Sequence, residues 1–293
     1  KHVYCEAPLA HTVEDAQAIA RAGQSAKTVF QAGLQNRVNP LHRHVLSFVR
    51  TGVLGKSTAQ ARLQFHKKMS WRRASADPER EKRINWHLDK ALSLGLVGEI
   101  GIHQVDVATW YLKNPPVSVL GFGGVMRWTD GRAVPDTVQC VFEYPNQVRA
   151  LFDATLVNSF EGSYTLFMGD ENAVLVRDQR AWMFREADAP LLGWEVYAKK
   201  DKIGDEMGIA LVADATRLLQ MGKEPGKEAD KIDAGKDALY YALEDFTRCI
   251  RENQKPACGP LGGLQATVVA IKANEAIYSG SKVIFQPQWF QVG

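Results

Sequence analysis

The sequence predicts an α/β protein in which a short parallel sheet is followed by a large, mainly antiparallel sheet with helices on one face. Strand and helix candidates alternate through the first 50 residues, at the spacing of parallel βαβ units. Between 117 and 185, strand candidates follow one another directly and turn residues separate them, which indicates an antiparallel meander. Two long helical patterns, at 238–253 and 264–279, are placed to cover one face of that meander.

The parallel part occupies the first 55 residues. A strand, a helix, a second strand and a second helix are expected at 2–6, 12–23, 27–34 and 41–50. Thr12 begins the first helix as a side-chain cap, and Gly23 is expected to end it. The character of the chain changes near Gly55, which divides it into a parallel part, 1–55, and a sheet domain, 56–293.

The sheet domain is expected to open with a strand over 56–66 and a polar loop region over 67–97 that holds one short helix. A helix over 99–112 follows and ends before Pro115. The meander and the last strand are expected at 117–126, 137–144, 148–156, 164–168, 173–177, 181–185 and 283–285. An apolar sheet face left uncovered by helices would favour a homodimer or homotetramer.

Composition restricts the class of protein. Hydrophobic residues make up 45% of the chain and charged residues 24%, as in globular proteins. The net charge is +3, without a long block of like charge, so we expect no nucleic-acid or membrane partner. No apolar run approaches the roughly 20 residues that cross a bilayer. Four scattered cysteines favour reduced thiols and, by default, a cytoplasmic location.

The segment from Gly98 to Asp106 carries the residues that best suit chemistry. On a helix, Glu99 and His103 share a face because they are four residues apart, and Asp106 lies beside His103. A carboxylate next to an imidazole raises its pKa and fixes its tautomer, which suits a general base. Gly98 and Gly101 would leave space for a ligand at the first turn. The same spacing also fits a surface salt bridge, and the set is too small to indicate a metal.

Several segments, in order, resemble one enzyme family. Residues 1–10, KHVYCEAPLA, resemble the GKHVYCEKPLA signature of Gfo/Idh/MocA oxidoreductases, and 33–40 is similar to the strand-to-helix segment that follows it. Residues 99–106 resemble the family's acidic-x-x-x-His-x-x-Asp helix, and 244–246 with 275–280 resemble its closing helices. The resemblance covers nearly the whole chain. It implies a Rossmann domain joined to an open-faced sheet domain, with NAD or NADP between them.

The resemblance also implies a reaction, in which a hydride passes between the nicotinamide and a hydroxyl-bearing carbon of a sugar, a cyclitol or a derivative. His103 is implied as the general acid/base, Glu99 as its acidic partner and Asp106 as a supporting aspartate. The residues implied at the cofactor are Glu6, Pro8, Arg37 and Asn39. Weaker candidates for the substrate pocket, for which a packing or solvent role is equally compatible, are His66, Trp71 and Arg72.

Two departures from the family pattern bear on activity. Ala7 stands where the family has a lysine that holds the reacting oxygen, so dehydrogenase activity is expected to be weak or of another kind. The Gly-x-Gly-x-x-Gly turn of a Rossmann domain is absent, and we expect roughly a hundred further residues upstream of Lys1, in line with a usual domain size. The glycine-rich run 121–124 lies between strands and is expected to be a bulge or turn.

Three functions stay open on these residues. The first is a polyol or sugar oxidoreductase, which would consume added NAD with a free sugar. The second is a glycoside-cleaving enzyme of the same scaffold, which would use bound NAD for transient oxidation without net turnover of the cofactor. The third is a non-catalytic sugar-binding or oligomerising protein, favoured by Ala7. It would bind carbohydrate without turnover even after an Ala7→Lys substitution.

Overall fold

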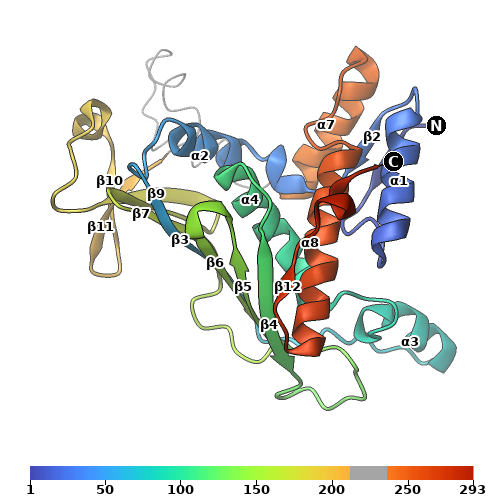
Figure 1. Ribbon diagram of the computed structural model, residues 1–293. Helices are drawn as coiled ribbons and strands as arrows, with labels where there is room; N and C mark the ends of the chain where they lie inside the picture. The colour runs from blue at the N-terminus through green and yellow to red at the C-terminus, as the bar shows by residue number, and fades with distance from the viewer. Residues whose placement is uncertain (212–235, 293) are drawn as a thin grey trace.

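The computed structural model describes residues 1–211 and 236–292, and these form two sheets of very different size (Figure 1). In the small sheet, β1 (Val3–Cys5) pairs in parallel with β2 (Phe30–Ala32), and α1 (Val13–Ser25) connects them. The predicted parallel βαβ unit is therefore confirmed. A short 3-10 turn, η1 (Gln35–Arg37), and α2 (Pro40–Arg50) then lead to the large sheet.

The large sheet is mainly antiparallel, as predicted. Its strands are β3 (Thr58–His66), β4 (Ser118–Gly124), β5 (Thr137–Glu143), β6 (Arg149–Thr155), β7 (Ser163–Gly169), β8 (Asn172–Arg177), β9 (Arg180–Arg185), β10 (Lys200–Ile203), β11 (Glu206–Ala210) and β12 (Val283–Ile284). Within the described ranges they lie in the order β10-β11-β9-β8-β7-β3-β6-β5-β4-β12. Among the described strands of this sheet, only β3 and β6 pair in parallel.

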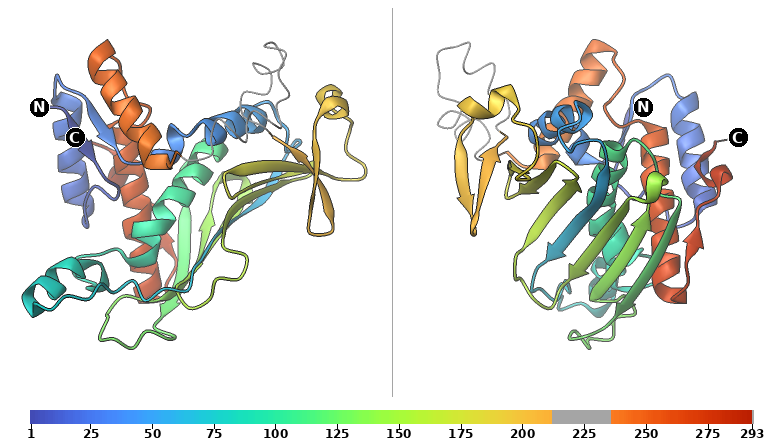
Figure 2. Two further views of the ribbon diagram at one scale, coloured as in Figure 1. Left: turned by 180° about the vertical axis from the view of Figure 1, so that it is seen from behind. Right: turned by 60° about the vertical axis from the view of Figure 1, so that its left-hand side comes forward.

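The helices of this part lie mostly on one side of the sheet. They are α3 (Pro78–Ile84), η2 (Trp86–Leu88), η3 (Val97–Gly101), α4 (Ile102–Leu112), η4 (Pro145–Gln147), η5 (Gly193–Tyr197), α7 (Ala238–Glu252), α8 (Pro260–Ser279) and η6 (Pro287–Phe290). In Figures 1 and 2, α4 and α8 lie behind one face of the strands, and α3 projects away from the sheet as an arm. The opposite face of the sheet carries no helix in these views.

Helix α8 joins the two parts, because it packs against α1 on one side and against β4 on the other. Two glycines of β4 make the second contact close: a Cβ on Gly121 or Gly123 would lie 2.8 Å from a side-chain carbon of Ile277. The run 121–124 was expected to form a bulge or turn. It instead lies in a regular register with β5, and its glycines provide space for the helix.

Two further differences from the sequence prediction have local causes. Gly23 does not end α1, which continues to Ser25. A Cβ at Gly23 would meet Pro260 and Phe30 at about 3 Å, so this glycine serves close packing. The hairpin of β10 and β11 was not predicted, because its strands are short, charged and at the edge of the sheet, where an alternating apolar pattern is not required.

Candidate active site

The small sheet brings two loops together at one edge. Because β1 and β2 are parallel, the residues that follow them, Glu6 to Pro8 and Gly33 to Gln35, leave the sheet on the same side. A side chain at Gly33 would collide with the Glu6 carboxylate, so only glycine allows this approach. Partial burial raises the pKa of Glu6, and a hydrogen bond from Gln35 partly opposes that shift. The Ala7–Pro8 peptide bond is cis.

The turn η1 holds helix α4 to this edge. The Asn36 side chain donates to the carbonyl oxygen of His103 at 3.4 Å. Arg37 donates to both carboxylate oxygens of Asp106, from Nε at 2.9 Å and from a terminal nitrogen at 2.6 Å. The two side chains are 14% and 2% exposed, so the pair is nearly withdrawn from water. Burial alone would lower the pKa of Arg37, but its bonds to Asp106 outweigh burial and raise it.

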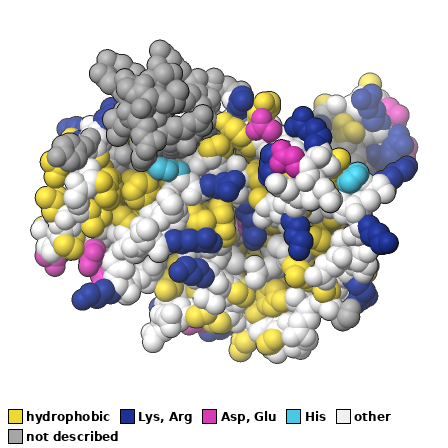
Figure 3. Space-filling view, turned by 90° about the horizontal axis from the view of Figure 1, so that it is seen from above, with side chains coloured by type: hydrophobic (Ala, Val, Ile, Leu, Met, Phe, Trp, Pro, Cys, Tyr) yellow, Lys and Arg dark blue, Asp and Glu magenta, His cyan; other side chains and the backbone are white. Residues whose placement is uncertain are grey.

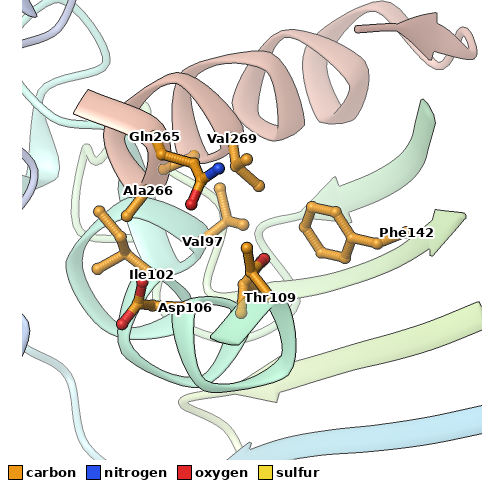
Figure 4. Close-up of a pocket in the computed structure, with 10 residues that line it drawn as sticks. Val97, Ile102, Asp106, Thr109, Phe142, Gln265, Ala266 and Val269 are labelled. Carbon is orange, nitrogen blue, oxygen red and sulfur yellow. The ribbon is translucent and has the colours of Figure 1, made fainter. Parts of the chain in front are cut away.

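This ion pair changes the role that Arg37 and Asp106 can take. Two of Arg37's donors are committed to Asp106, so Arg37 anchors α4 in addition to any contact that it makes with a cofactor. A cavity of about 10 Å³ lies next to Asp106, between α4 and α8. Gln265 of α8 points toward α4 at this place (Figure 4). That volume is about the size of one water molecule, so it is a packing gap and not a ligand site.

His103 lies at the start of α4 with its ring free of hydrogen bonds to any described residue. Burial lowers the pKa of His103, and the charge of Asp106 opposes this shift only in part. From the sequence spacing, the neighbouring carboxylate of Asp106 was expected to raise the pKa of His103. The net direction is the reverse, because the imidazole is buried and Arg37 neutralises Asp106. The imidazole is therefore neutral near pH 7 and able to accept a proton.

Glu99 lies in η3, which is a π-helix from Val97 to Gly101. The π turn ends before His103, which lies in α4, and no hydrogen bond joins Glu99 to His103 among the described residues. Glu99 instead accepts from the Ser93 hydroxyl at 3.1 Å. Burial raises the pKa of Glu99, while the Ser93 bond and the nearby His11 lower it by less.

Two residues that act on Glu99 were not predicted from the sequence, namely Ser93 and His11. Ser93 is buried and its hydroxyl also accepts from the amide of Gly95, so a structural turn positions it. Nothing in its sequence surroundings distinguishes it. His11 directly follows the signature segment 1–10, and that position was the available signal.

The space expected beside the glycines of this helix is filled. A Cβ on Gly98 would collide with Leu94, and one on Gly101 would lie 2.7 Å from the Phe152 ring of β6. Gly98 and Gly101 therefore allow the helix to pack closely and do not open a path for a ligand. This corrects the expectation from sequence, which could not place β6 against this turn.

The other predicted site residues lie in separate surroundings. Asn39 caps α2, because its side-chain oxygen accepts from the Leu41 amide at 2.9 Å. His66, at the end of β3, binds Asp153 at 3.1 Å on the large sheet. Trp71 packs edge to face on His87 at 5.2 Å, and Arg72 binds Glu81 at 3.0 Å; both belong to the base of the α3 arm. The roles predicted for these residues stay predictions.

Metal-ion clusters, membrane-spanning helices and disulfides are absent from the described ranges. No group of three or more His, Cys, Asp or Glu side chains there is placed to hold a metal ion. None of the described helices combines the length and the apolar character that a membrane crossing requires. The four cysteines are free thiols. Seen from above, Lys and Arg side chains lie in separate spots among neutral ones (Figure 3).

Comparison with known proteins agrees with this architecture. Residues 42–174 match the GFO/IDH/MocA C-terminal domain. No curated protein matches the chain. Among solved structures, similar ones include an aldose-aldose oxidoreductase from Caulobacter crescentus in complex with glycerol. It is 21% identical with a TM-score of 0.67, and the match covers 97% of this chain and 72% of that one.

Two further structures give the same result. An oxidoreductase domain protein from Kribbella flavida is 18% identical with a TM-score of 0.72, over 97% of this chain and 74% of that one. A levoglucosan dehydrogenase in complex with NADH and levoglucosan is 17% identical with a TM-score of 0.71, over 97% of this chain and 73% of that one. At these identities the likeness concerns the fold. The family model therefore identifies residues 42–174 as a GFO/IDH/MocA C-terminal domain, and the solved structures show the same overall fold over 97% of this chain.

Proposed function

We propose that this protein is an oxidoreductase that transfers a hydride between NAD or NADP and a hydroxyl-bearing carbon of a sugar, a cyclitol or a derivative. The observation that carries the proposal is the buried imidazole of His103, neutral and without a hydrogen-bond partner among the described residues. It lies on a helix that η1 attaches to the carboxyl edge of a parallel sheet. The similar levoglucosan dehydrogenase and aldose-aldose oxidoreductase support a sugar as the substrate class.

The edge of the small sheet fits the nicotinamide end of such a cofactor. In open α/β sheets, ligands bind outside the carboxyl ends of the parallel strands. Glu6 and Pro8 follow β1 at that end, and Gly33 leaves the loop without a side chain there. We infer that Glu6 and Pro8 border the nicotinamide, which would supply the hydride acceptor when bound.

The residues of this chain would then move the proton. In the direction of oxidation, Nδ1 or Nε2 of neutral His103 accepts the hydroxyl proton of the substrate as the carbon–hydrogen bond breaks. Asp106 stabilises the imidazolium by its charge, and Arg37 holds Asp106 in place. The Glu99 carboxyl, whose pKa burial raises, would bind a neighbouring substrate hydroxyl, and its bond from Ser93 would orient it.

A His103→Gln substitution in the full-length protein tests this proposal. Glutamine keeps a polar side chain of similar length but cannot accept the proton, so kcat should fall about 10²- to 10⁴-fold. Formation of NADH in the presence of free sugars measures the rate, and an unchanged melting temperature would show that the fold is intact. Unchanged rates in the folded variant would remove His103 from the mechanism.

The uncovered face of the large sheet supports a homodimer or homotetramer. A row of side chains crosses adjacent strands on this face, and its members are Leu120, Val141, Leu151, Leu166 and Leu175, with Arg62 between β6 and β7. Val141 and Leu151 are 38% and 41% exposed. Apolar strands at this level of exposure are typical of a surface that a second subunit covers.

We further propose that residues 1–55 are the C-terminal part of a dinucleotide-binding domain, and that 56–293 form the substrate-binding and oligomerising sheet domain. The two separate sheets support this division. Free thiols at all four cysteines support a reducing compartment such as the cytoplasm.

A further inference from the structure

We propose that the pocket at the base of the α3 arm binds a second sugar ring of an extended carbohydrate, next to the ring that reacts at Glu99 and His103. This inference rests on the proposed function and names its substrate class more closely. The pocket has a volume of about 650 Å³. That is within the range of about 300–1,000 Å³ usual for small-molecule sites and exceeds the space that a single sugar ring needs.

The apolar part of the pocket is a pair of exposed side chains. Trp86 of η2 is 43% exposed and Leu92 is 46% exposed, and both line the pocket. The exposed indole ring beside an exposed leucine offers a ligand a flat apolar surface. The flat carbon–hydrogen face of a pyranose is the kind of surface that packs on an indole ring.

The polar part of the pocket offers both donors and acceptors. Lys82 and Asp89 line it, and neither makes an ion pair with any residue in ranges 1–211 and 236–292. Arg72 and Glu81 line it as a bonded pair at 3.0 Å. Hydroxyl groups around a sugar ring need donors and acceptors of this kind in equal measure.

The charges of the pocket favour a neutral ligand. Its basic side chains Arg72 and Arg132 share the carboxylate of Asp130, at 3.2 Å and 2.7 Å, and Arg72 also binds Glu81. Lys82 is balanced by Asp89. An anionic or cationic ligand would find no excess of opposite charge in this pocket. An uncharged polyhydroxyl compound needs no such excess and is therefore the better fit.

The walls of the pocket are held in place before any ligand binds. Arg132 is 1% exposed at its side chain and donates to Asp130 and to the backbone oxygen of Ser70. Asn85 exchanges hydrogen bonds with the backbone of Arg73 at 2.8 Å and 2.7 Å, which fixes the end of α3 to the chain that follows β3. Because these side chains are already ordered, ligand binding loses little free energy to the ordering of the pocket walls.

The pocket lies close to the candidate catalytic group, with one buried residue, Ser93, between them. Ser93 follows Leu92 in the chain, and its amide donates to the carbonyl oxygen of Asp89 at 3.0 Å. The Ser93 hydroxyl donates to Glu99 at 3.1 Å. Ser93 is itself buried, so it bridges the pocket wall and the acid of the site and holds the two places close together, within reach of adjoining rings of one molecule.

Calorimetric binding of glucose, cellobiose and maltose to the full-length protein, without cofactor, tests the inference. At least one disaccharide is expected to bind about tenfold more tightly than glucose. Trp86→Ala, and separately Lys82→Ala, should remove that advantage and leave glucose binding unchanged. Phe160→Ala is the matched control, because Phe160 is an aromatic side chain 75% exposed outside the pocket and should change nothing.

The outcomes separate this inference from the proposed reaction. If His103→Gln and the wild type both lack turnover but still prefer a disaccharide, the proposed reaction fails and the pocket assignment stands. Equal binding of all three sugars, no binding of either disaccharide, or a preference that survives Trp86→Ala would overturn the assignment. A change of oligomeric state in Trp86→Ala would also overturn it, because the pocket would then be a subunit interface.

Discussion

Ala7 is half-buried between Glu6 and the cis bond to Pro8, against the apolar cluster that contains Leu9 and Leu264. A lysine at this position could keep its methylene groups on the cluster and extend its ammonium to the edge. We expect Ala7→Lys to raise kcat about 10- to 100-fold, because a positioned cation stabilises the developing charge on the reacting oxygen. Steady-state formation of NADH measures the gain.

Ala7→Met is the control for that substitution, since it adds a similar stem without the charge and should leave kcat near the wild-type value. If the folded lysine variant gains nothing while carbohydrate still binds, the non-catalytic, sugar-binding function becomes the better description of this chain.

The protonation of His103 yields a second prediction at the scale of one residue. Asp106 is the group that opposes the lowering of the His103 pKa by burial, and Glu99, Glu6 and Arg37 are the other charged groups near this edge. Asp106→Asn removes the opposing charge and leaves Arg37 unneutralised. Both effects disfavour the imidazolium, so the His103 pKa should fall further.

A base with a lower pKa stays unprotonated to lower pH. The acid limb of the kcat/KM profile for oxidation, already below pH 6.5 in the wild type, should therefore move to still lower pH in Asp106→Asn. Asp153→Asn, which alters the carboxylate that binds His66 on the large sheet, should leave the limb in place. A limb that moves to higher pH in Asp106→Asn would contradict the assignment.

At the scale of elements, the contact of α8 with β4 depends on glycine. Gly121→Ala would place a methyl group 2.8 Å from Ile277 and 3.0 Å from the Cys140 sulfur, in a region without space to yield. We expect a loss of about 1–3 kcal/mol in the free energy of unfolding, measured by urea denaturation. Gly193→Ala is the control, because nothing lies within 4 Å of its added methyl group. Equal effects of the two substitutions would refute the close contact.

Helix η3 shows where prediction from sequence ends. Turn residues and periodicity located most strands and helices, because those signals are local. The relation of Glu99 to His103 was drawn on an α-helix, but Gly98 against Leu94 and Gly101 against Phe152 accompany a π turn there. Phe152 lies in a strand some fifty residues later, and no local pattern reports its contact.

The ion pair between Arg37 and Asp106 was likewise not predicted from the sequence. Both residues were predicted for the site, one at the cofactor and one at the helix. Their bidentate bond spans 69 positions of sequence and depends on how η1 packs against α4. Residue types and motif order thus gave candidate members of the site, while tertiary packing decided which of these candidates pair.

For the whole molecule, helices within ranges 1–211 and 236–292 cover only one face of the large sheet. Phe142 and Phe152 point to the helices and are fully buried, whereas their neighbours Val141 and Leu151 point the other way and are exposed. Such a sheet buries its second apolar face when two copies meet. The α3 arm and the uncovered face are therefore separate surfaces, which we propose for carbohydrate binding and for self-association respectively.

Leu151→Glu tests the second of these surfaces. Leu151 lies in β6 between Val141 and Arg62 in the middle of the sheet, and it is 41% exposed, so the fold should tolerate the change. A carboxylate buried without full compensation at a symmetric interface costs several kcal/mol, and a two-fold axis brings in two of them. Light scattering after gel filtration should show the wild type as a dimer or tetramer and the variant at a lower mass. Leu261→Glu is the control, because it adds the same charge at a 48% exposed position in the first turn of α8 and should keep the wild-type mass. A monomeric wild type, or a Leu151→Glu variant that assembles unchanged, would rule out the sheet face as the subunit contact.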